Sequence, residues 1–590
     1  MSEDPAAPPA SVRSRVALAG LWGTLALVGF AAIVLGYREF LFSTDDAYIS
    51  FRYVRNLLDG HGLVWNPAPF HRVDGYTSFG WVVLLAAASK VTGRMPPDVC
   101  HPLTLGLTLI TWPLFLALAW KLVGRGLEGR HDTRLGARGR VGLVALAALG
   151  LVTNRTFLTW TSSGLEAAMF TCVVTGWALA LIARRRRWSP ALVGALAALS
   201  RPEGLLVWAL TLGWLGWKLT LVGVEAWRAR RARSSVSLAT NDAPQTEGAR
   251  DGRRREVWRL LVAGLSALVP VLAHALWHRA TYGAWLPNTY YAKVARPEWR
   301  LGLRYVASFL IEYSAWPGVL VLVGLGLRAA VRRRLSSEAL AVSAFAVGLM
   351  TYYGLIAGGD HFEFKVFHTL VPLYWAAVAW ALASGWGATR RRRGLTLAGA
   401  SLAVLASWPL AWGHHLATRG LSTRGDTFKL RHAMAPHAPA LLRGYVGLYD
   451  SMQSTLIDRF YGMRHREHAA FFEWKKREIP DEAPKPFDAS NPDVALVGEV
   501  GLLGYRFPSV AVIDVFGLND RFIARYRRSQ RRNERVGHEG VPPPGYLEAF
   551  DANVVIERNR VKRRPHKRPL TPERVKAIEG KAARHVLARP

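Results

Sequence analysis

Residues 16–56 read VALAGLWGTLALVGFAAIVLGYREFLFSTDDAYISFRYVRN, and this stretch decides the fold class. Its first part, residues 16–37, is uncharged and long enough to cross about 30 Å of hydrocarbon as a helix. Two adjacent carboxylates, Asp45 and Asp46, follow soon after it. Ionised groups lose hydration beside hydrocarbon, so they are rarely placed there without a function. The simpler interpretation is that Thr44, Asp45 or Asp46 caps the next helix, for which only one of the two acids is needed.

Apolar runs and arginine clusters define the class of protein. Hydrophobic side chains make up 51% of the 590 residues and are gathered into long runs, so we expect a mainly α-helical, multi-pass membrane bundle. The net charge of +34 lies largely in arginines between the runs, where such clusters report topology. No basic groove with interleaved aromatic residues accompanies them, so we expect no nucleic acid among the partners.

The apolar runs also divide the chain. They fill residues 1–413, the expected membrane domain, and residues 414–590 read as a smaller soluble domain. Short buried strands at 494–497 and 510–513 predict that this second domain is α/β. The basic tail after residue 558 is expected to be loose.

Charge parity predicts the topology. Two apolar segments separate each pair of consecutive arginine clusters, so all the clusters lie on one side, which the positive-inside rule makes cytoplasmic. The segment 77–92 is too short to span and is expected to lie along the outer face or dip into it. The clusters are at 125–140, 184–187, 227–255, 328–334 and 390–393.

The result is about eleven spans in the cytoplasmic membrane, with the N-terminus inside and the C-terminal domain outside. The polar segment 227–255 is expected to be an unstructured cytoplasmic linker. The expected spans are 16–37, 103–123, 141–157, 165–183, 189–200, 205–223, 257–278, 303–327, 336–357, 369–387 and 394–413.

This topology gathers the unusual polar loops on the outer face. They hold aromatic faces and amides that suit sugars, and acids and cations that suit hydroxyl and phosphate groups. The first loop, 38–102, contributes His61, Trp65, Asn66, Asp74 and Tyr76. The later loops contribute Glu166, Arg201, Glu203, Asn288, Tyr290, Tyr291, Lys293, Asp360, His361 and Glu363.

Structural roles remain open for several of these residues. Tryptophan and tyrosine anchor membrane interfaces, and Glu166 stands where a helix N-terminus favours an acid. Arg201 and Glu203 are able to pair with each other instead of facing a ligand.

A metal site has a weak signal. Asp360, His361 and Glu363 supply one histidine among acids, and an oxygen-rich Mg²⁺, Mn²⁺ or Ca²⁺ site assembled across loops stays open. No Ser-His-Asp arrangement or Gly-rich nucleotide loop is visible in the sequence. A lipid-linked sugar donor at the membrane face therefore fits better than a nucleotide sugar.

Several motifs carry a family resemblance in the same order along most of the chain. They are DDAYISFRYVRNLLDGHGLVWNP (45–67), VDGYTSF (73–79), SSGLE (162–166), SRPEG (200–204), LPNTYYAK (286–293), GGDHFEF (358–364), GEVGLLGY (498–505) and IDVFGLND (513–520). With these motifs the chain resembles the GT-C glycosyltransferases, and among them the mycobacterial-type terminal arabinofuranosyltransferases. The first-loop motif is quite specific, and the others are individually weak.

The resemblance implies a membrane glycosyltransferase with a polyprenyl-phosphate sugar donor and an envelope glycan or glycolipid acceptor. The family places a catalytic acid in the first outer loop, which maps to Asp45 or Asp46 as general base in an inverting displacement. Adjacent residues diverge by about 100° on a helix, so one acid is the base, and we favour Asp45. Cationic partners for the leaving phosphate would be Arg52, Arg55, Arg201 and Lys293.

Departures from the family pattern concern the substrates. The family often has Glu and Asn where this chain has Asp74 and Ser78, and Trp where it has His361. These differences leave the sugar and acceptor open. The alternative class is a transporter or flippase for lipid-linked glycans, which would place ionisable residues near mid-membrane and show repeat symmetry.

Overall fold

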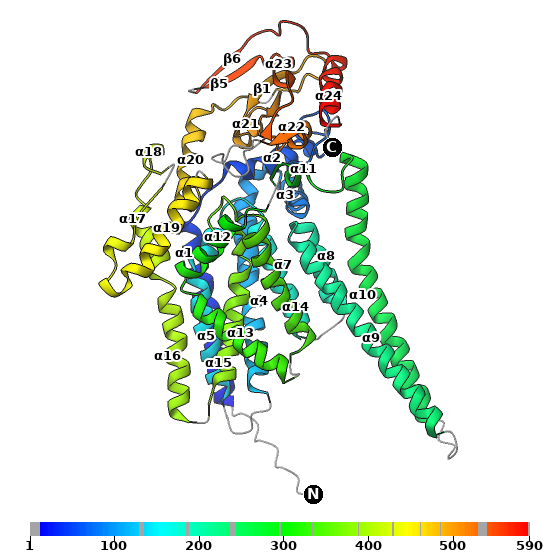
Figure 1. Cartoon of the computed structure of the whole chain (residues 1–590), viewed down its shortest axis with the longest axis vertical. Coiled ribbons are helices and arrows are strands. Elements are labelled where there is room, and N and C mark those ends of the chain that lie inside the picture. Colours follow the sequence, from blue (N-terminus) through cyan, green and yellow to red (C-terminus); the bar gives the residue numbers. More distant parts are fainter. Residues whose placement is uncertain are drawn as a thin grey trace.

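Long helices form one layer of the molecule and a mixed helix-and-strand layer covers one end of it (Figure 1). The computed structural model describes residues 12–587 except 129–134, 184–187, 237–243, 294–296, 333–334, 388, 428–429, 461, 484, 529–539 and 558. The helices of the first layer are α1 (Val12–Glu39), α4 (Pro96–Leu127), α5 (Ala137–Val152), α7 (Ala167–Ala183), α8 (Trp188–Ser200), α9 (Gly204–Val236), α10 (Pro244–Tyr282), α14 (Ser337–Thr351), α15 (Leu370–Gly385) and α16 (Arg390–Ala406).

The helices agree with a multi-pass membrane protein. Within the described residues, six helices are long and apolar enough to cross a membrane, or seven if one bent pair counts as a span. Shorter apolar helices, including α7 and α15, pack among them. The predicted fold class, a helical membrane bundle with a smaller α/β part, is confirmed, while the count of eleven spans stays a prediction.

The expected span at 303–327 is not one continuous helix. Helices α12 (Trp299–Glu312) and α13 (Trp316–Val331) occupy it, and their axes meet at 100°. Ser314, between the two helices, has a φ of 44°. Pro317 lies in the first turn of α13 and has no N–H, so it cannot donate the backbone hydrogen bond that would extend α12. The chain therefore turns at this point.

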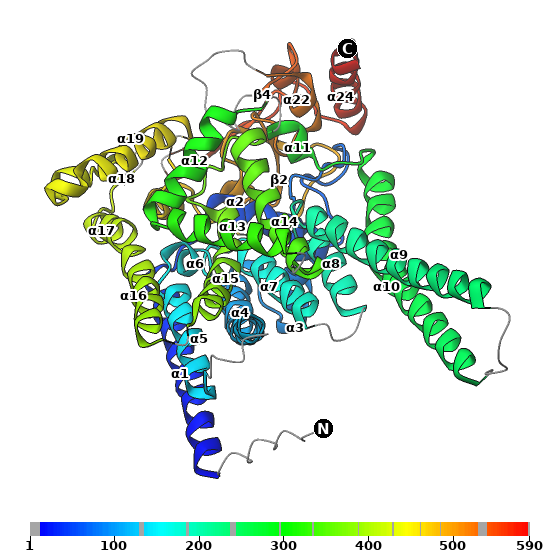
Figure 2. The same cartoon turned by 60° about the horizontal axis from the view of Figure 1, so that its bottom comes forward.

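Two segments that we expected to be irregular have structure. Within 227–255, α9 runs to Val236 and α10 begins at Pro244, and the two helices pack along each other and project away from the bundle (Figures 1 and 2). Alanine and arginine favour helix, and Arg231 lies 5.4 Å from the ring centre of Trp227 one turn earlier. The expected loose tail contains β6 (Arg560–Arg563), paired with β5 (Val554–Glu557), and the helix α24 (Pro572–Leu587).

The covering layer joins the first loop to the C-terminal part of the chain. The first loop forms α2 (Asp45–Leu58) and the short α3 (Phe79–Thr92). The predicted strands are confirmed as β1 (Asp493–Val497) and β2 (Val510–Asp514), which pair in parallel around α21 (Gly501–Arg506). Helix α2 packs on α21, and the apolar core runs without a break from the membrane helices into this layer.

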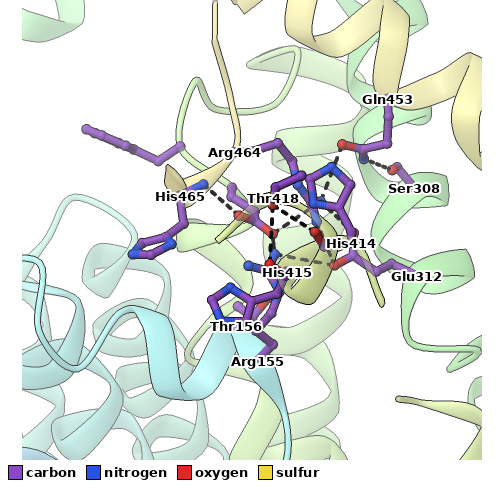
Figure 3. Close-up of polar contacts among 12 residues, drawn as sticks. Arg155, Thr156, Ser308, Glu312, His414, His415, Thr418, Gln453, Arg464 and His465 are labelled. Atoms are coloured by element: carbon purple, nitrogen blue, oxygen red, sulfur yellow. Dashed lines mark hydrogen bonds and ion pairs between the residues drawn. The ribbon is translucent and has the colours of Figure 1, made fainter. Parts of the chain in front are cut away.

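A buried ion-pair cluster ties the C-terminal helices to the bundle (Figure 3). Arg464 precedes α20 (His465–Glu478), and its Nη1 lies 2.7 Å from Glu312 of α12 and 3.1 Å from Glu363. Arg155 of α6 (Arg155–Thr159) pairs with the same two glutamates. Tyr449 of α19 (Arg443–Phe460) donates to Glu312, and the four charges balance. The expected domain boundary at 413/414 falls inside α17 (Pro409–Thr418).

Candidate functional site

A cavity of about 1520 Å³ lies between the bundle and the covering layer. Residues from the first loop, from the short connections between membrane helices and from the C-terminal part line it together. Among the predicted site residues, its walls contain Asp45, Asp46, Asp74, Tyr76, Glu166, Arg201, Glu203, Tyr290, Lys293, Asp360 and His361. The structure thus brings together residues that are far apart in the sequence, from loops that we expected on one face.

Asp46 faces this cavity and belongs to a three-membered polar chain. Its Oδ2 lies 3.3 Å from His361 Nε2, and His361 Nδ1 lies 3.2 Å from Asp360 Oδ1. The Asp46 side chain is 35% exposed, so a ligand in the cavity has access to it. Burial by itself would raise the pKa of Asp46, but the hydrogen bond and charge of His361, with Lys293 and Lys365, hold it well below its usual value.

His361 has the opposite shift. Burial would lower the pKa of its imidazole, but hydrogen bonds with Asp360 and Asp46 and their charges raise it above its usual value. The two glycines before Asp360 have φ values of 79° and 103°, a region that side chains avoid, which shapes the loop that presents this pair.

Asp45 has a different environment from its neighbour. One oxygen accepts from Lys475 Nζ and from the backbone N–H of Leu502, both at 2.9 Å, and the other accepts from Gly501 N at 3.0 Å. Gly501 is needed because a Cβ there would collide with the Asp45 backbone carbonyl. The cap of α2 is Thr44, whose Oγ1 accepts from Ala47 N at 3.3 Å. Asp45 therefore joins the first loop to the C-terminal part, and our preference for Asp45 as the base loses its support.

Two of the expected phosphate partners point away from the cavity. Arg52 is buried and donates to the backbone carbonyls of Trp65 at 2.7 Å and Val510 at 2.9 Å, so its fork holds β2 instead of a ligand. Arg55 donates to the Tyr505 carbonyl at 3.0 Å. Both arginines lie within α2, on the face that packs against the C-terminal part, so neither is available as a donor-phosphate residue.

Arg201 lies in the cavity wall with its charge already matched. It pairs with Glu166, and its Nε and Nη2 lie 3.0 and 2.8 Å from the Glu203 carboxylate. Tyr353 also donates to Glu203. Burial would raise the pKa of Glu203, but the charge of Arg201 outweighs it and lowers this pKa. Lys293 is exposed, and among the described residues it has no ion-pair partner, which leaves it available to an anion.

The remaining expected sugar-binding residues divide into two groups. Asp74 and Tyr76 line the cavity, and each has a partner that was not predicted from the sequence. Asp74 Oδ2 lies 2.6 Å from His278 Nε2, and the hydroxyls of Tyr76 and Tyr282 lie 3.0 Å apart. The other group does not line the cavity. Trp65 and Asn66 donate to the Val512 carbonyl of β2, and Asn288 and Tyr291 contact Arg525. Glu363 belongs to the ion-pair cluster, and His61 is exposed at the surface.

Lys365 and Lys475 were not among the expected site residues. Lys365, the cation that directly follows the GGDHFEF motif, lies 3.9 Å from Glu166. Lys475 carries no motif, and no signal in the sequence would have linked it to Asp45.

The described residues contain no group of three or more His, Cys, Asp or Glu side chains that could hold a metal ion. His361 itself fills the space between Asp46 and Asp360.

Two curated proteins confirm the predicted resemblance, and no protein-family model matches the chain. Both are named terminal beta-(1->2)-arabinofuranosyltransferase. The one from Mycobacterium tuberculosis is 28% identical over 366 residues, which are 56% of this chain and 50% of the relative. The one from Corynebacterium glutamicum is 26% identical over 293 residues, 48% of this chain and 38% of the relative. The chain spans half or less of the length of these relatives.

Solved membrane proteins are also similar. Archaeal oligosaccharyltransferase AglB from Archaeoglobus fulgidus has a TM-score of 0.46 and 12% identity, covering 86% of this chain and 65% of that one. ArnT from Cupriavidus metallidurans has a TM-score of 0.46 and 13% identity, covering 85% and 87%. Likeness at this level carries no argument about the reaction.

Proposed function

We propose that this protein is a membrane glycosyltransferase that transfers a sugar from a polyprenyl-phosphate donor to an envelope glycan or glycolipid, with Asp46 as the general base. The observation that carries the proposal is the contrast between the two adjacent acids. Asp45 has both oxygens engaged, whereas Asp46 is open to a cavity large enough for a glycan.

In the proposed step, Asp46 takes the proton of an acceptor hydroxyl as the hydroxyl oxygen attacks the anomeric carbon. The bond between that carbon and the phosphate oxygen breaks, inverting the anomeric centre, and polyprenyl phosphate leaves. Lys293, which has no described ion-pair partner, balances the leaving charge, with Lys365 on the same cavity wall. Arg201 positions Glu166 and Glu203.

The names of the relatives supply the first substrates to test. Arabinofuranose is the donor sugar to try first, and an arabinan oligosaccharide the acceptor. The likeness covers only part of each relative, so both remain proposals. We place the site on the outer face of the cytoplasmic membrane, following the positive-inside rule.

The test uses purified protein in detergent with polyprenyl-phosphate [14C]arabinofuranose and an arabinan oligosaccharide. Label should appear in the oligosaccharide, and polyprenyl phosphate should be released in equal amount. A transporter or flippase has no membrane to work across in this assay, so an absence of transfer by folded protein, with transport of the same donor in vesicles, would contradict the proposal.

A further inference from the structure

A second large cavity, of about 1980 Å³, lies in the membrane bundle away from the site of Asp46. Residues of α4, α13, α14 and α15 make up most of its lining, with smaller contributions from α5, α7, α12 and α16. It shares no lining residue with the cavity of Asp46, although α14 contributes Met350 to this cavity and Leu349 to the other, and it takes no part in the proposed transfer.

The cavity lies beside α13, which contacts α15 near its start and has no buried residue among those described. Near its start α13 touches α15, since a methyl group added at Gly318 would collide with the Tyr374 hydroxyl. Farther along, no described residue of α13 is buried, and Gly326, which lines the cavity, has open space beside it. The cavity follows α15 from Leu370 to Gly385, a rise of about 24 Å, which is longer than half of a bilayer core of about 30 Å.

The charges in this cavity lie at one end. Its cationic side chains are Lys121, Arg125, Arg140, Arg328, Arg332 and Arg392, and Glu128 is the one acid among its described lining residues. They come from the C-terminal ends of α4 and α13 and the N-terminal ends of α5 and α16, which our topology places in the cytoplasm. The opposite end carries Asn154, Tyr313 and Leu370.

These cations are short of acidic partners. Within the described part of the chain, Arg140, Arg328, Arg332 and Arg392 form no ion pair. Arg140 lies 4.2 Å from the ring centre of Trp120, and its buried Nε has no hydrogen-bond partner. An unpaired guanidinium N–H is costly to bury, and a phosphate is its natural bidentate acceptor.

We propose that this cavity binds an anionic phospholipid of the cytoplasmic leaflet. Its phosphate would lie among Arg140, Arg332 and Arg392, and an acyl chain would follow α15 toward Leu370. Basic pockets between transmembrane helices on the cytoplasmic side are suited to anionic head groups. An apolar cavity with cations at one end matches a lipid that has apolar chains and a negatively charged head group. A zwitterionic lipid would place its own positive group among the six cations, where the charges repel.

The test is lipid binding to the delipidated full-length protein in detergent, counted by native mass spectrometry. Dioleoylphosphatidylglycerol should bind at least tenfold more tightly than dioleoylphosphatidylcholine, which has the same chains. Removing three charges with Arg140→Gln, Arg332→Gln and Arg392→Gln together should abolish this preference. The control Arg228→Gln, Arg390→Gln and Arg391→Gln removes the same charge from residues that do not line the cavity, and should keep it.

A second pair of variants keeps every charge. Gly324 and Gly326 both lie on α13 with open space beside them, but only Gly326 lines the cavity. Gly326→Phe should therefore block phosphatidylglycerol binding, and Gly324→Phe should not. Equal binding of the two lipids, an unchanged preference in the triple variant, or equal effects of the two glycine variants would overturn the proposal. So would tighter binding of undecaprenyl phosphate through the same arginines, which would make a carrier lipid the occupant.

Discussion

Asp45 and Asp46 show how much one position matters in the first turn of a helix. Both follow Thr44, which caps α2, and they diverge by about 100° around its axis. Gly501, Leu502 and Lys475 hold the Asp45 side chain, whereas Asp46 contacts His361, and all four partners lie far along the chain. The sequence therefore predicts that only one acid is available for chemistry, but not which one.

Other site residues follow the same rule. Arg52 looks like a phosphate ligand in sequence because it is an arginine in an outer loop, yet its partners are the carbonyls of residues in and beside β2. Asp74 and Tyr76 were predicted, while their partners His278 and Tyr282 sit at the end of α10 without a motif. Local motifs identify candidate site residues. Contacts with residues far away in the sequence decide which of them are already bonded within the protein and which are free to bind a ligand.

His361 provides a prediction about pH at this scale. Its pKa is raised, and its protonated ring pairs with Asp46 and makes that base weaker. As pH rises through this raised pKa, the ring becomes neutral and Asp46 is released, so the transfer rate should rise. The stabilising contribution of the pair is present below the unfolded histidine pKa and should be lost over the same rise in pH.

The measurement is the pH profile of kcat/KM and of the thermal midpoint. In His361→Gln the step above the usual histidine pKa should disappear from both profiles. The control is His71→Gln, whose ring lies outside the cavity walls. A profile that is the same in His361→Gln as in the wild type would rule out this role.

Helices and strands were predictable to different degrees. The strands at 494–497 and 510–513 are apolar runs bounded by turn residues, and they appear where expected. The bend between α12 and α13 was missed because hydropathy alone reads 303–327 as one run, although Pro317 lies inside it. The helices of 227–255 were missed because a polar composition does not exclude helix where two neighbours pack together.

The ion-pair cluster predicts the cost of separating these elements. Replacing Arg464 with methionine leaves Glu312 and Glu363 sharing Arg155 in a buried place, which should cost about 3–5 kcal/mol of stability. The exposed pair of Arg431 and Asp458 should be worth about 0–1 kcal/mol, so Arg431→Met is the matched control.

Thermal unfolding in detergent, or urea denaturation followed by tryptophan fluorescence, measures both variants. Limited proteolysis should also release the C-terminal helices of Arg464→Met more readily, since the cluster joins them to α12. Equal stability of the two variants would show that the cluster contributes no more than a surface pair.

At the scale of the whole molecule, several arginine-bearing helix ends lie close together. The arginine-bearing ends of α4, α5, α13 and α16 line one cavity. This agrees with the expectation that these arginine clusters lie on the same side of the membrane. The cluster at 184–187 lies outside the described residues. Sequence reasoning did not predict that the first loop and the C-terminal part share one core, because that contact joins segments more than four hundred residues apart.

The orientation in the membrane has a direct prediction. A cysteine at Lys90, at the end of α3, should react with a membrane-impermeant maleimide added to intact cells. A cysteine at Arg391, at the start of α16, should react only after the membrane is opened. Cys100 and Cys172 are buried and unpaired, so they give little background. The reverse labelling pattern would invert the topology and move the cavity of Asp46 to the cytoplasm.

The central claim is that Asp46 performs the chemistry and Asp45 holds the structure around it. The most direct measurement compares Asp46→Asn with Asp45→Asn in purified, folded protein, for both donor binding and sugar transfer per bound donor. We predict that Asp46→Asn binds the polyprenyl-phosphate sugar but transfers at less than about one hundredth of the wild-type rate, the range of a lost general base. Asp45→Asn should lose thermal stability and keep measurable transfer. Transfer near the wild-type rate in Asp46→Asn would contradict the account.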